Sequence, residues 1–339
     1  MAARNRGSAS ATIKTLQKRN RQLKYVSVGL AIAVVLIGIY SQTSSINVAI
    51  NGQPFGQRLT GINNPLTPQQ LSVINNASDA NFETAGMMLL NGSLPGEFSS
   101  GNTSYGVIQV VPTNQIAAFT ANGKPSVIYI GAISCVYCGE SRWAMSLALS
   151  RFGSFNSLYT GYSSLGDGDV PSLYWKQNNI TNATVTYGSS FSSRYINFIA
   201  AEYDSPITAG FQLPNLADPL QYYIQNAPNA TYSSALMYMD RTGLFSGTPF
   251  TLWGRVADRG AVSSVFGPTS KAATNTPGIT FMTQAQILDQ LKSFNTTLAL
   301  QEYAGADVYA AQVCPSINNA APICSLPAIK SLEANMGLA

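Results

Sequence analysis

Hydrophobic positions along this chain follow two different periods, and together they predict a mixed α/β protein. Short runs of β-branched and aromatic residues at 105–111 and 127–130 predict strands. Apolar residues recur every three or four positions at 68–90, after Cys138 and at 283–298, which predicts helices. The pattern therefore predicts a strand before Cys135 and a helix after Cys138.

Shorter elements are expected elsewhere. The helical stretch at 68–90 should break near Asn75-Asn76, and a helical tail should follow the main domain at 301–339. Between these two helical regions the pattern predicts a hairpin at 184–187 and 195–201 and a buried strand at 235–239. A further strand should begin at Thr248-Pro249, and a charged turn at 255–259 should lead to a last strand at 261–266.

An uncharged stretch at 25–40 predicts a transmembrane helix that anchors the protein in the membrane. Seven Lys and Arg and no Asp or Glu precede it, so the tail at 1–24 should stay in the cytosol. As a helix the stretch rises about 24 Å against a hydrocarbon core of about 30 Å, so we extend the anchor to 25–43. A cleaved signal peptide is the alternative, although no small-residue cleavage site follows Tyr40. Residues 44–104 are expected to form an extracytosolic stalk with a helical and loop extension.

The positive charge of the chain is concentrated in that cytosolic tail. The formal net charge is +4, yet without those seven residues twelve Lys and Arg face fifteen Asp and Glu. Nothing after residue 40 forms a basic patch, so we expect no nucleic-acid partner. The membrane is the partner expected of the anchor at 25–43. Charged residues make up only 10%, and neutral polar residues replace them, which suits an extracytosolic surface.

Histidine does not occur in the sequence. This excludes Ser-His-Asp and Cys-His catalysis as well as histidine-ligated metals. We expect no metal and no cofactor.

Cys135 and Cys138 are the candidate catalytic residues. The strand at 127–130 precedes them and a helix follows, so a helix N-terminus favours the thiolate at Cys135. Cys135 is expected to be the exposed nucleophile and Cys138 the resolving thiol. A structural disulfide or half a zinc site are the alternatives; the spacing of the other two cysteines does not suit zinc.

Cys314 and Cys324 form a second candidate disulfide. In an oxidising compartment an even cysteine count favours pairing, and this pair is expected to staple the C-terminal tail. A relay to Cys135 and Cys138, partners on other chains and free thiols are the alternatives. Seven glycosylation sequons follow the anchor, at Asn76, Asn91, Asn102, Asn179, Asn182, Asn229 and Asn295.

The strand before Cys135, the Cys-x-x-Cys, the helix after it and Thr248-Pro249 resemble the thioredoxin superfamily over roughly 105–300. The resemblance implies that Pro249 follows a cis peptide bond beside the cysteines, and that Thr248 and Pro249 bind an extended substrate. The long separation between Cys138 and Pro249 is closer to the disulfide-oxidoreductase branch and implies a β-rich insertion at about 156–230.

Shorter motifs resemble an archaeal family of membrane-anchored thioredoxin-like proteins of unknown function. They are Tyr129-Ile130-Gly131, Cys135-x-Tyr137-Cys138, Arg142-Trp143-Ala144 and Leu149-Ser150-Arg151-Phe152-Gly153.

The chain departs from the thioredoxin pattern in the groups that tune the thiols. Val136 and Tyr137 stand between the cysteines, and no acid lies in the strand at 127–130. Glu140 and Arg142 are the nearest charged residues along the chain.

These features predict a membrane-anchored, extracytosolic thiol–disulfide oxidoreductase. Its partners would be client proteins with cysteines and a redox partner that the sequence does not identify. A non-catalytic surface glycoprotein on the same scaffold is the main alternative.

Overall fold

The apolar run at 127–130 becomes part of the central strand of a mixed sheet. In the computed structural model this strand, β3, spans Lys124–Ala132 and is buried from Ser126 onward. The sheet order is β1-β11-β10-β3-β9-β7, and β2 also pairs with β3. Among the described pairs of this sheet only β3 and β9 run parallel. The other strands are β1 (Val107–Val110), β2 (Thr120–Ala121), β7 (Thr184–Tyr187), β9 (Asn197–Asp204), β10 (Phe250–Trp253) and β11 (Val256–Arg259).

The structure describes residues 62–94, 107–110, 120–133, 135–163, 170–177, 184–204, 224–225, 227, 230–241, 248–254, 256–259 and 282–339. The predicted tail at 1–24, the anchor at 25–43 and the strand at 261–266 lie outside these residues. Within them, we find no helix that combines the length and apolarity needed to cross a membrane.

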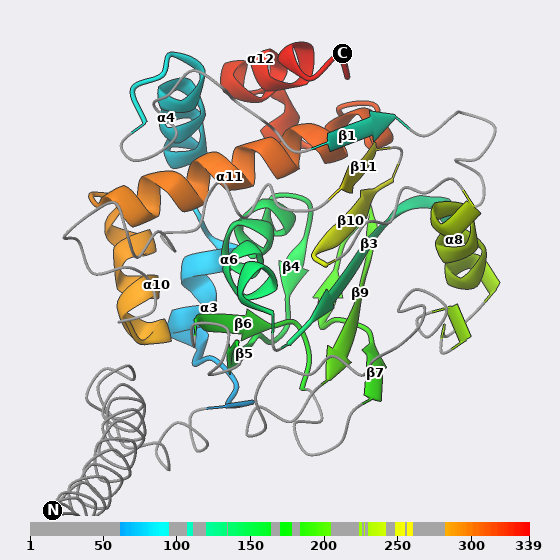
Figure 1. Ribbon diagram of the computed structural model, residues 1–339. Helices are drawn as coiled ribbons and strands as arrows, with labels where there is room; N and C mark the ends of the chain where they lie inside the picture. Colours follow the sequence, from blue (N-terminus) through cyan, green and yellow to red (C-terminus); the bar gives the residue numbers. More distant parts are fainter. Residues whose placement is uncertain are drawn as a thin grey trace, which may run out of the picture. The chain divides into compact units, whose positions relative to one another are not determined.

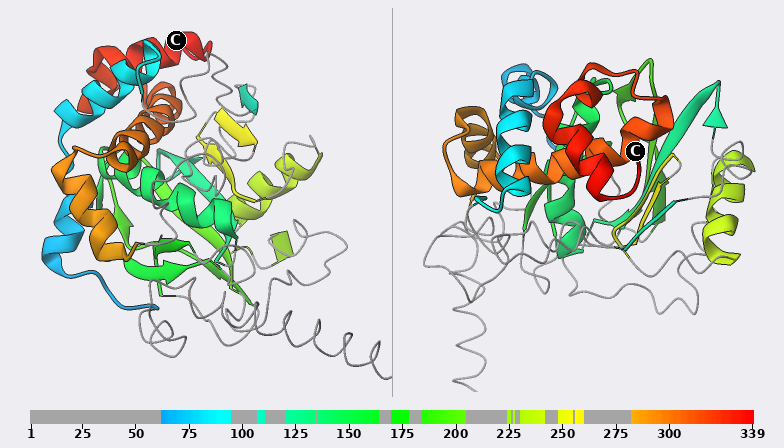
Figure 2. Two further views of the ribbon diagram at one scale, coloured as in Figure 1. Left: turned by 60° about the vertical axis from the view of Figure 1, so that its left-hand side comes forward. Right: turned by 90° about the horizontal axis from the view of Figure 1, so that it is seen from above.

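Helices cover both faces of the sheet. Helix α6 (Val136–Ser150) lies on one face, and α8 (Ala230–Arg241) lies on the other (Figures 1 and 2). Helix α11 (Thr297–Val313) crosses α6, and all but three of its residues are buried, as expected of a central helix. Helices α4 (Asp79–Leu90) and α12 (Pro327–Asn335) pack on α11 in turn (Figure 1).

The predicted break near Asn75-Asn76 is confirmed. Helix α3 (Pro68–Asn75) ends there, and Ser78 begins α4 by accepting a hydrogen bond from the Ala80 amide. A predicted helix at 283–298 is instead two helices. Helix α10 (Gln284–Ser293) begins after its N-cap Thr283 and ends at Phe294, whose left-handed backbone (φ 52°) turns the chain into α11.

Small elements complete the described fold. There are two two-stranded sheets: β4 (Ser154–Phe155) pairs with β8 (Phe191–Ser192), and β5 (Tyr159–Tyr162) pairs with β6 (Pro171–Tyr174). Two 3₁₀ segments, η5 (Cys314–Ile317) and η6 (Pro322–Ser325), connect α11 to α12.

Two local predictions were wrong. Residues 235–239 lie in α8, because a short apolar run fits a buried helix as well as a strand and Ala, Leu and Met favour the helix. The predicted charged turn at 255–259 is mostly β11, since the chain already reverses at Gly254, where φ is +66°.

Gly56–Ala339 forms one compact unit, which includes part of the predicted segment at 44–104 and all of those at 105–300 and 301–339. Helix α11, most of it in the predicted tail, is part of the core. Strand β9, inside the predicted insertion at about 156–230, pairs directly with β3. Long-range packing therefore joins stretches that the sequence pattern had divided.

Candidate functional site

The two central cysteines lie where β3 gives way to α6. Cys135 is the N-cap of α6, with extended backbone (φ −75°, ψ 129°). Its sulfur accepts a hydrogen bond from the Cys138 amide at 3.4 Å, so the first turn of α6 directs an N–H group at the sulfur. Both cysteines are free thiols in this structure.

Cys135 is buried, with 6% of its surface exposed, and Cys138 is completely buried. The expectation of an exposed nucleophile is therefore not met in this conformation. Tyr137, between the two cysteines, is 45% exposed and is one of the two exposed large hydrophobic side chains in the described part of the chain. The site thus presents an aromatic ring to solvent and keeps the sulfurs inside.

Thr248 and Pro249 lie beside Cys135, just before β10. Their peptide bond, which the resemblance implied to be cis, is cis. The Cys135 thiol donates a hydrogen bond to the Thr248 carbonyl over 3.9 Å. The pairing of β10 with β3 brings these distant residues together, with Phe250 opposite Ile130.

Cys138 points into the protein. The Ala132 amide donates to its sulfur at 3.5 Å. Burial raises the pKa of the Cys138 thiol well above its ordinary value, the Cys135 thiol raises it further, and the nearby Arg142 guanidinium acts in the opposite direction. Cys138 is therefore a protonated thiol at neutral pH.

Arg142 and Glu202 form a buried ion pair next to Cys138. Arg142 donates from Nε to Glu202 Oε1 at 3.0 Å and from Nη2 to Oε2 at 2.7 Å. The same guanidinium donates to the Ala132 carbonyl (3.0 Å) and to Ser172 Oγ (3.2 Å). It therefore ties α6 to the end of β3, to β6 and to β9.

Glu202 was missed by the sequence analysis, which looked for an acid only in the strand before Cys135. Glu202 lies on β9, opposite Gly131 of β3. The available signal was an acidic residue inside the apolar run at 198–203, because a charge in a buried strand needs a partner. Glu140, also buried, does not make the ion pair with Arg142; Glu202 does.

Tyr129 closes the inner side of the site. Burial raises the pKa of its hydroxyl well above the ordinary value, with the neighbouring Cys138 as the next cause. Its ring packs edge-on against Trp175, with centroids 4.7 Å apart. The ring also covers Gly131, where a Cβ would lie 2.3 Å from the Tyr129 hydroxyl oxygen. Only glycine fits at 131 while Tyr129 keeps this position.

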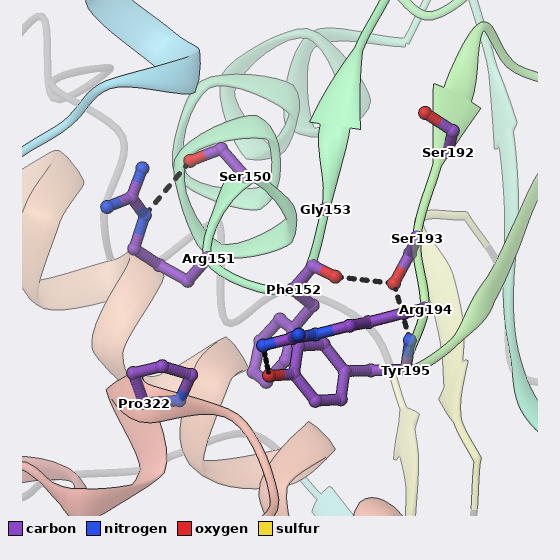
Figure 3. A pocket seen from close by; sticks show the side chains of 9 residues that line it. All are labelled: Ser150, Arg151, Phe152, Gly153, Ser192, Ser193, Arg194, Tyr195 and Pro322. Carbon is purple, nitrogen blue, oxygen red and sulfur yellow. Dashed lines mark hydrogen bonds between the residues drawn. The ribbon is translucent and has the colours of Figure 1, made fainter.

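A hollow of about 600 Å³ lies at the other end of α6 (Figure 3). Its polar groups already bind protein atoms: Ser193 donates to the Phe152 carbonyl, and Arg151 binds the carbonyls of Asn75 and Ala77. Arg194 lies over the Tyr195 ring, 4.7 Å from its centroid. The hollow is remote from the cysteines, and we do not assign the site to it.

The remaining predicted site residues are dispersed. Cys314 and Cys324 form a disulfide between η5 and η6, away from the end of α6 that holds Cys135. Asn76, Asn91 and Asn295 are exposed. The sequons at Asn102, Asn179, Asn182 and Asn229 lie outside the described residues.

The fold and site define an α/β protein with a thiol pair at a strand–helix junction. Residues 111–314, more than half of the chain, match the family described as a domain of unknown function, DUF929. The chain belongs to this family. No curated protein and no solved structure matched the chain.

Proposed function

We propose that this protein is a membrane-anchored thiol–disulfide oxidoreductase that acts outside the cytosol on cysteines of secreted or surface proteins. One observation carries the proposal. The Cys135 sulfur lies at the start of α6, where it accepts the Cys138 amide and contacts the Thr248 carbonyl. The Cys138 amide and the N-terminus of α6 stabilise a thiolate at Cys135, and the second thiol lies one helical turn away.

The reaction follows from the roles of the two sulfurs. The Cys135 thiolate attacks one sulfur of a client disulfide, which breaks that bond and releases the other client sulfur as a thiolate that takes up a proton. Cys138 then loses its proton and attacks Cys135, so the second client sulfur leaves. The client gains two electrons and two protons, and Cys135 and Cys138 become a disulfide. Client oxidation is the reverse sequence, and an external redox partner sets the direction.

The Arg142–Glu202 pair supports the second step. Cys138 is buried and protonated, and the Arg142 guanidinium lowers the pKa of its thiol. Arg142 is fixed by Glu202, Ser172 and the Ala132 carbonyl, so its charge needs no reorganisation when the Cys138 thiolate forms. In this proposal the pair takes the place of the missing histidine.

The finer family assignment is part of the same proposal. The parallel pair β3–β9, the helix that starts at Cys135 and the cis peptide bond before Pro249 are similar to the thioredoxin superfamily. Thr248 and Pro249 would then contact an extended client chain. The uncharged stretch at 25–40 and the preceding basic tail support an inside N-terminus and an extracytosolic main domain.

Client trapping tests the proposal. A Cys138→Ser variant of the full chain keeps the nucleophile and lacks the resolving thiol, so it should accumulate mixed disulfides with client proteins through Cys135. The matched Cys135→Ser variant should accumulate none. Equal trapping by the two variants, or no trapping together with no reductase or oxidase activity of the parent, contradicts the proposal.

Burial of Cys135 favours a second candidate function, a non-catalytic surface glycoprotein on this scaffold. Asn76, Asn91 and Asn295 are exposed and open to glycosylation. In this case the Cys135–Cys138 disulfide, once formed, should resist strong reductants in the folded protein. Ready reduction of that disulfide contradicts this candidate.

A further inference from the structure

Helix α11 carries two carboxyl groups into the protein interior. Glu302 is 1% exposed and Asp307 is completely buried. Each lies within electrostatic range of another carboxyl group from a helix packed on α11: Glu140 of α6 acts on Glu302, and Glu83 of α4 acts on Asp307. A buried carboxylate ordinarily has a cation as its partner, so this arrangement calls for an explanation.

Few polar groups surround these two carboxyls. The amide of Ala144, in α6, lies beside Glu302, while Oε2 of Glu302 meets no hydrogen-bond partner among the described residues. The amide of Gly86, inside α4, lies beside Asp307, but neither carboxyl oxygen forms a hydrogen bond of good geometry with it or with another described residue. Ionised carboxylates would need more hydrogen-bond donors than these two backbone amides.

The packing at Asp307 is tight. A Cβ on Gly86 would lie 2.9 Å from Asp307 Oδ2 and 2.8 Å from the Cβ of Ala328 in α12. The carboxyl is therefore enclosed between α4 and α12.

The nearby arginines are engaged elsewhere. Arg142 of α6 pairs with Glu202, and Arg151 pairs with Asp79 and lies over the Phe82 ring. On α12, Lys330 influences Glu333 and not Asp307. No cation of the described residues contributes to the environment of Glu302 or Asp307.

We propose that α11 is a proton-dependent latch: neutral, protonated Glu302 and Asp307 hold it against α6 and α4, and their ionisation at higher pH weakens that packing. The latch does not depend on thiol chemistry. It nevertheless acts on the helix that carries Cys135 and Cys138, because α11 packs against α6.

The pKa values of both carboxyl groups are raised, as the latch requires. Burial, followed by the neighbouring Glu140, raises the pKa of Glu302 well above its ordinary value. Burial, followed by Glu83, does the same for Asp307. Glu333 of α12 shifts in the same direction, chiefly through burial.

The sign of the pH dependence follows. A carboxyl whose pKa is raised in the folded state holds its proton where the unfolded chain has lost it, so the folded state binds more protons above about pH 4. The contribution of Glu302 and Asp307 to stability is complete below about pH 4 and falls as the pH rises toward the raised values. The latch therefore suits an acidic surrounding.

Neutral amides test the latch. In the full chain in detergent micelles, Glu302→Gln and Asp307→Asn mimic the protonated carboxyls. At about pH 7 each should raise the melting temperature by roughly 2–4 °C or more, and at about pH 3 the difference from the parent should shrink toward zero. Asp289→Asn, at an exposed position of α10, is the matched control and should leave the pH profile unchanged.

Infrared spectroscopy gives a readout that does not depend on stability. The parent should show the carbonyl stretch of protonated carboxylic acids at about pH 6, where ordinary Asp and Glu are ionised. Each amide variant should lose part of that band. No band in the parent, a stability difference that does not change with pH, or failure of both amide variants to fold at any pH overturns the proposal.

Discussion

Arg142 and Glu202 join α6, the helix that carries the thiol pair, to β9, the strand that runs parallel to β3. Two hydrogen bonds of 3.0 and 2.7 Å connect the side chains, which are 0% and 5% exposed. The pair lies next to Cys138, and its acid is on β9, whereas the strand before Cys135 contains no acid in its apolar run. It links the stability of the fold to the electrostatics of the site.

Removing one partner of this ion pair should be strongly destabilising. Glu202→Gln leaves the Arg142 guanidinium buried without its counter-charge, so we expect a loss of about 3–5 kcal/mol in the free energy of unfolding. Chemical denaturation of the full chain under reducing conditions measures it. The control is Asp79→Asn, which removes the partly exposed pair with Arg151 and should cost about 1 kcal/mol or less. Equal losses in the two variants would contradict the prediction.

Cys135 should have a measurable role as a helix cap. Its sulfur accepts the Cys138 amide, and a serine hydroxyl at this position keeps an acceptor while alanine does not. We expect Cys135→Ala to be less stable than Cys135→Ser by about 1 kcal/mol. Urea denaturation of the two variants gives the difference. Serine should have no comparable advantage at Cys138, which is fully buried and caps no helix.

Cys138 should react with alkylating reagents only at high pH. In a Cys135→Ser variant Cys138 is the one cysteine outside the Cys314–Cys324 disulfide. Because burial raises the pKa of its thiol, the alkylation rate in the folded state should still rise with pH above about 8.5, where an ordinary thiol has reached half of its plateau rate. The same variant in denaturant is the control. The raised pKa would be refuted if the alkylation rate of the folded variant reached its plateau at the same pH as that of the denatured control, or at a lower one.

Gly131 should be coupled energetically to Tyr129. A Cβ at 131 would lie 2.3–2.5 Å from atoms of the Tyr129 ring and hydroxyl. Gly131→Ala should therefore cost about 1–3 kcal/mol in the free energy of unfolding, because the ring must leave its place against Trp175. In a Tyr129→Ala background the same change should cost much less. Additive effects in a double-mutant cycle would show that the two residues do not compete for space.

Local sequence signals anticipated the parts of the fold that depend on near neighbours. The predicted break near Asn75-Asn76 is an example, because the end of α3 and the start of α4 depend on residues close along the chain. The central strand and the helix after Cys135 were likewise predicted, from the spacing of apolar residues and the length of each segment. The run at 235–239 was not, because a short apolar stretch has no distinguishing period.

By itself the sequence determined the spacing of Cys135 and Cys138, the strand before them and the helix after them, because each depends on residues close along the chain. Only the tertiary structure decided that Cys135 is buried, that Glu202 stands beside Cys138, and that α11 brings Glu302 to Glu140. These features come from contacts between residues 60 or more positions apart, whose pairing is set by the packing of the whole core. The thiol pair is thus a local motif, whereas its electrostatic surroundings belong to the fold.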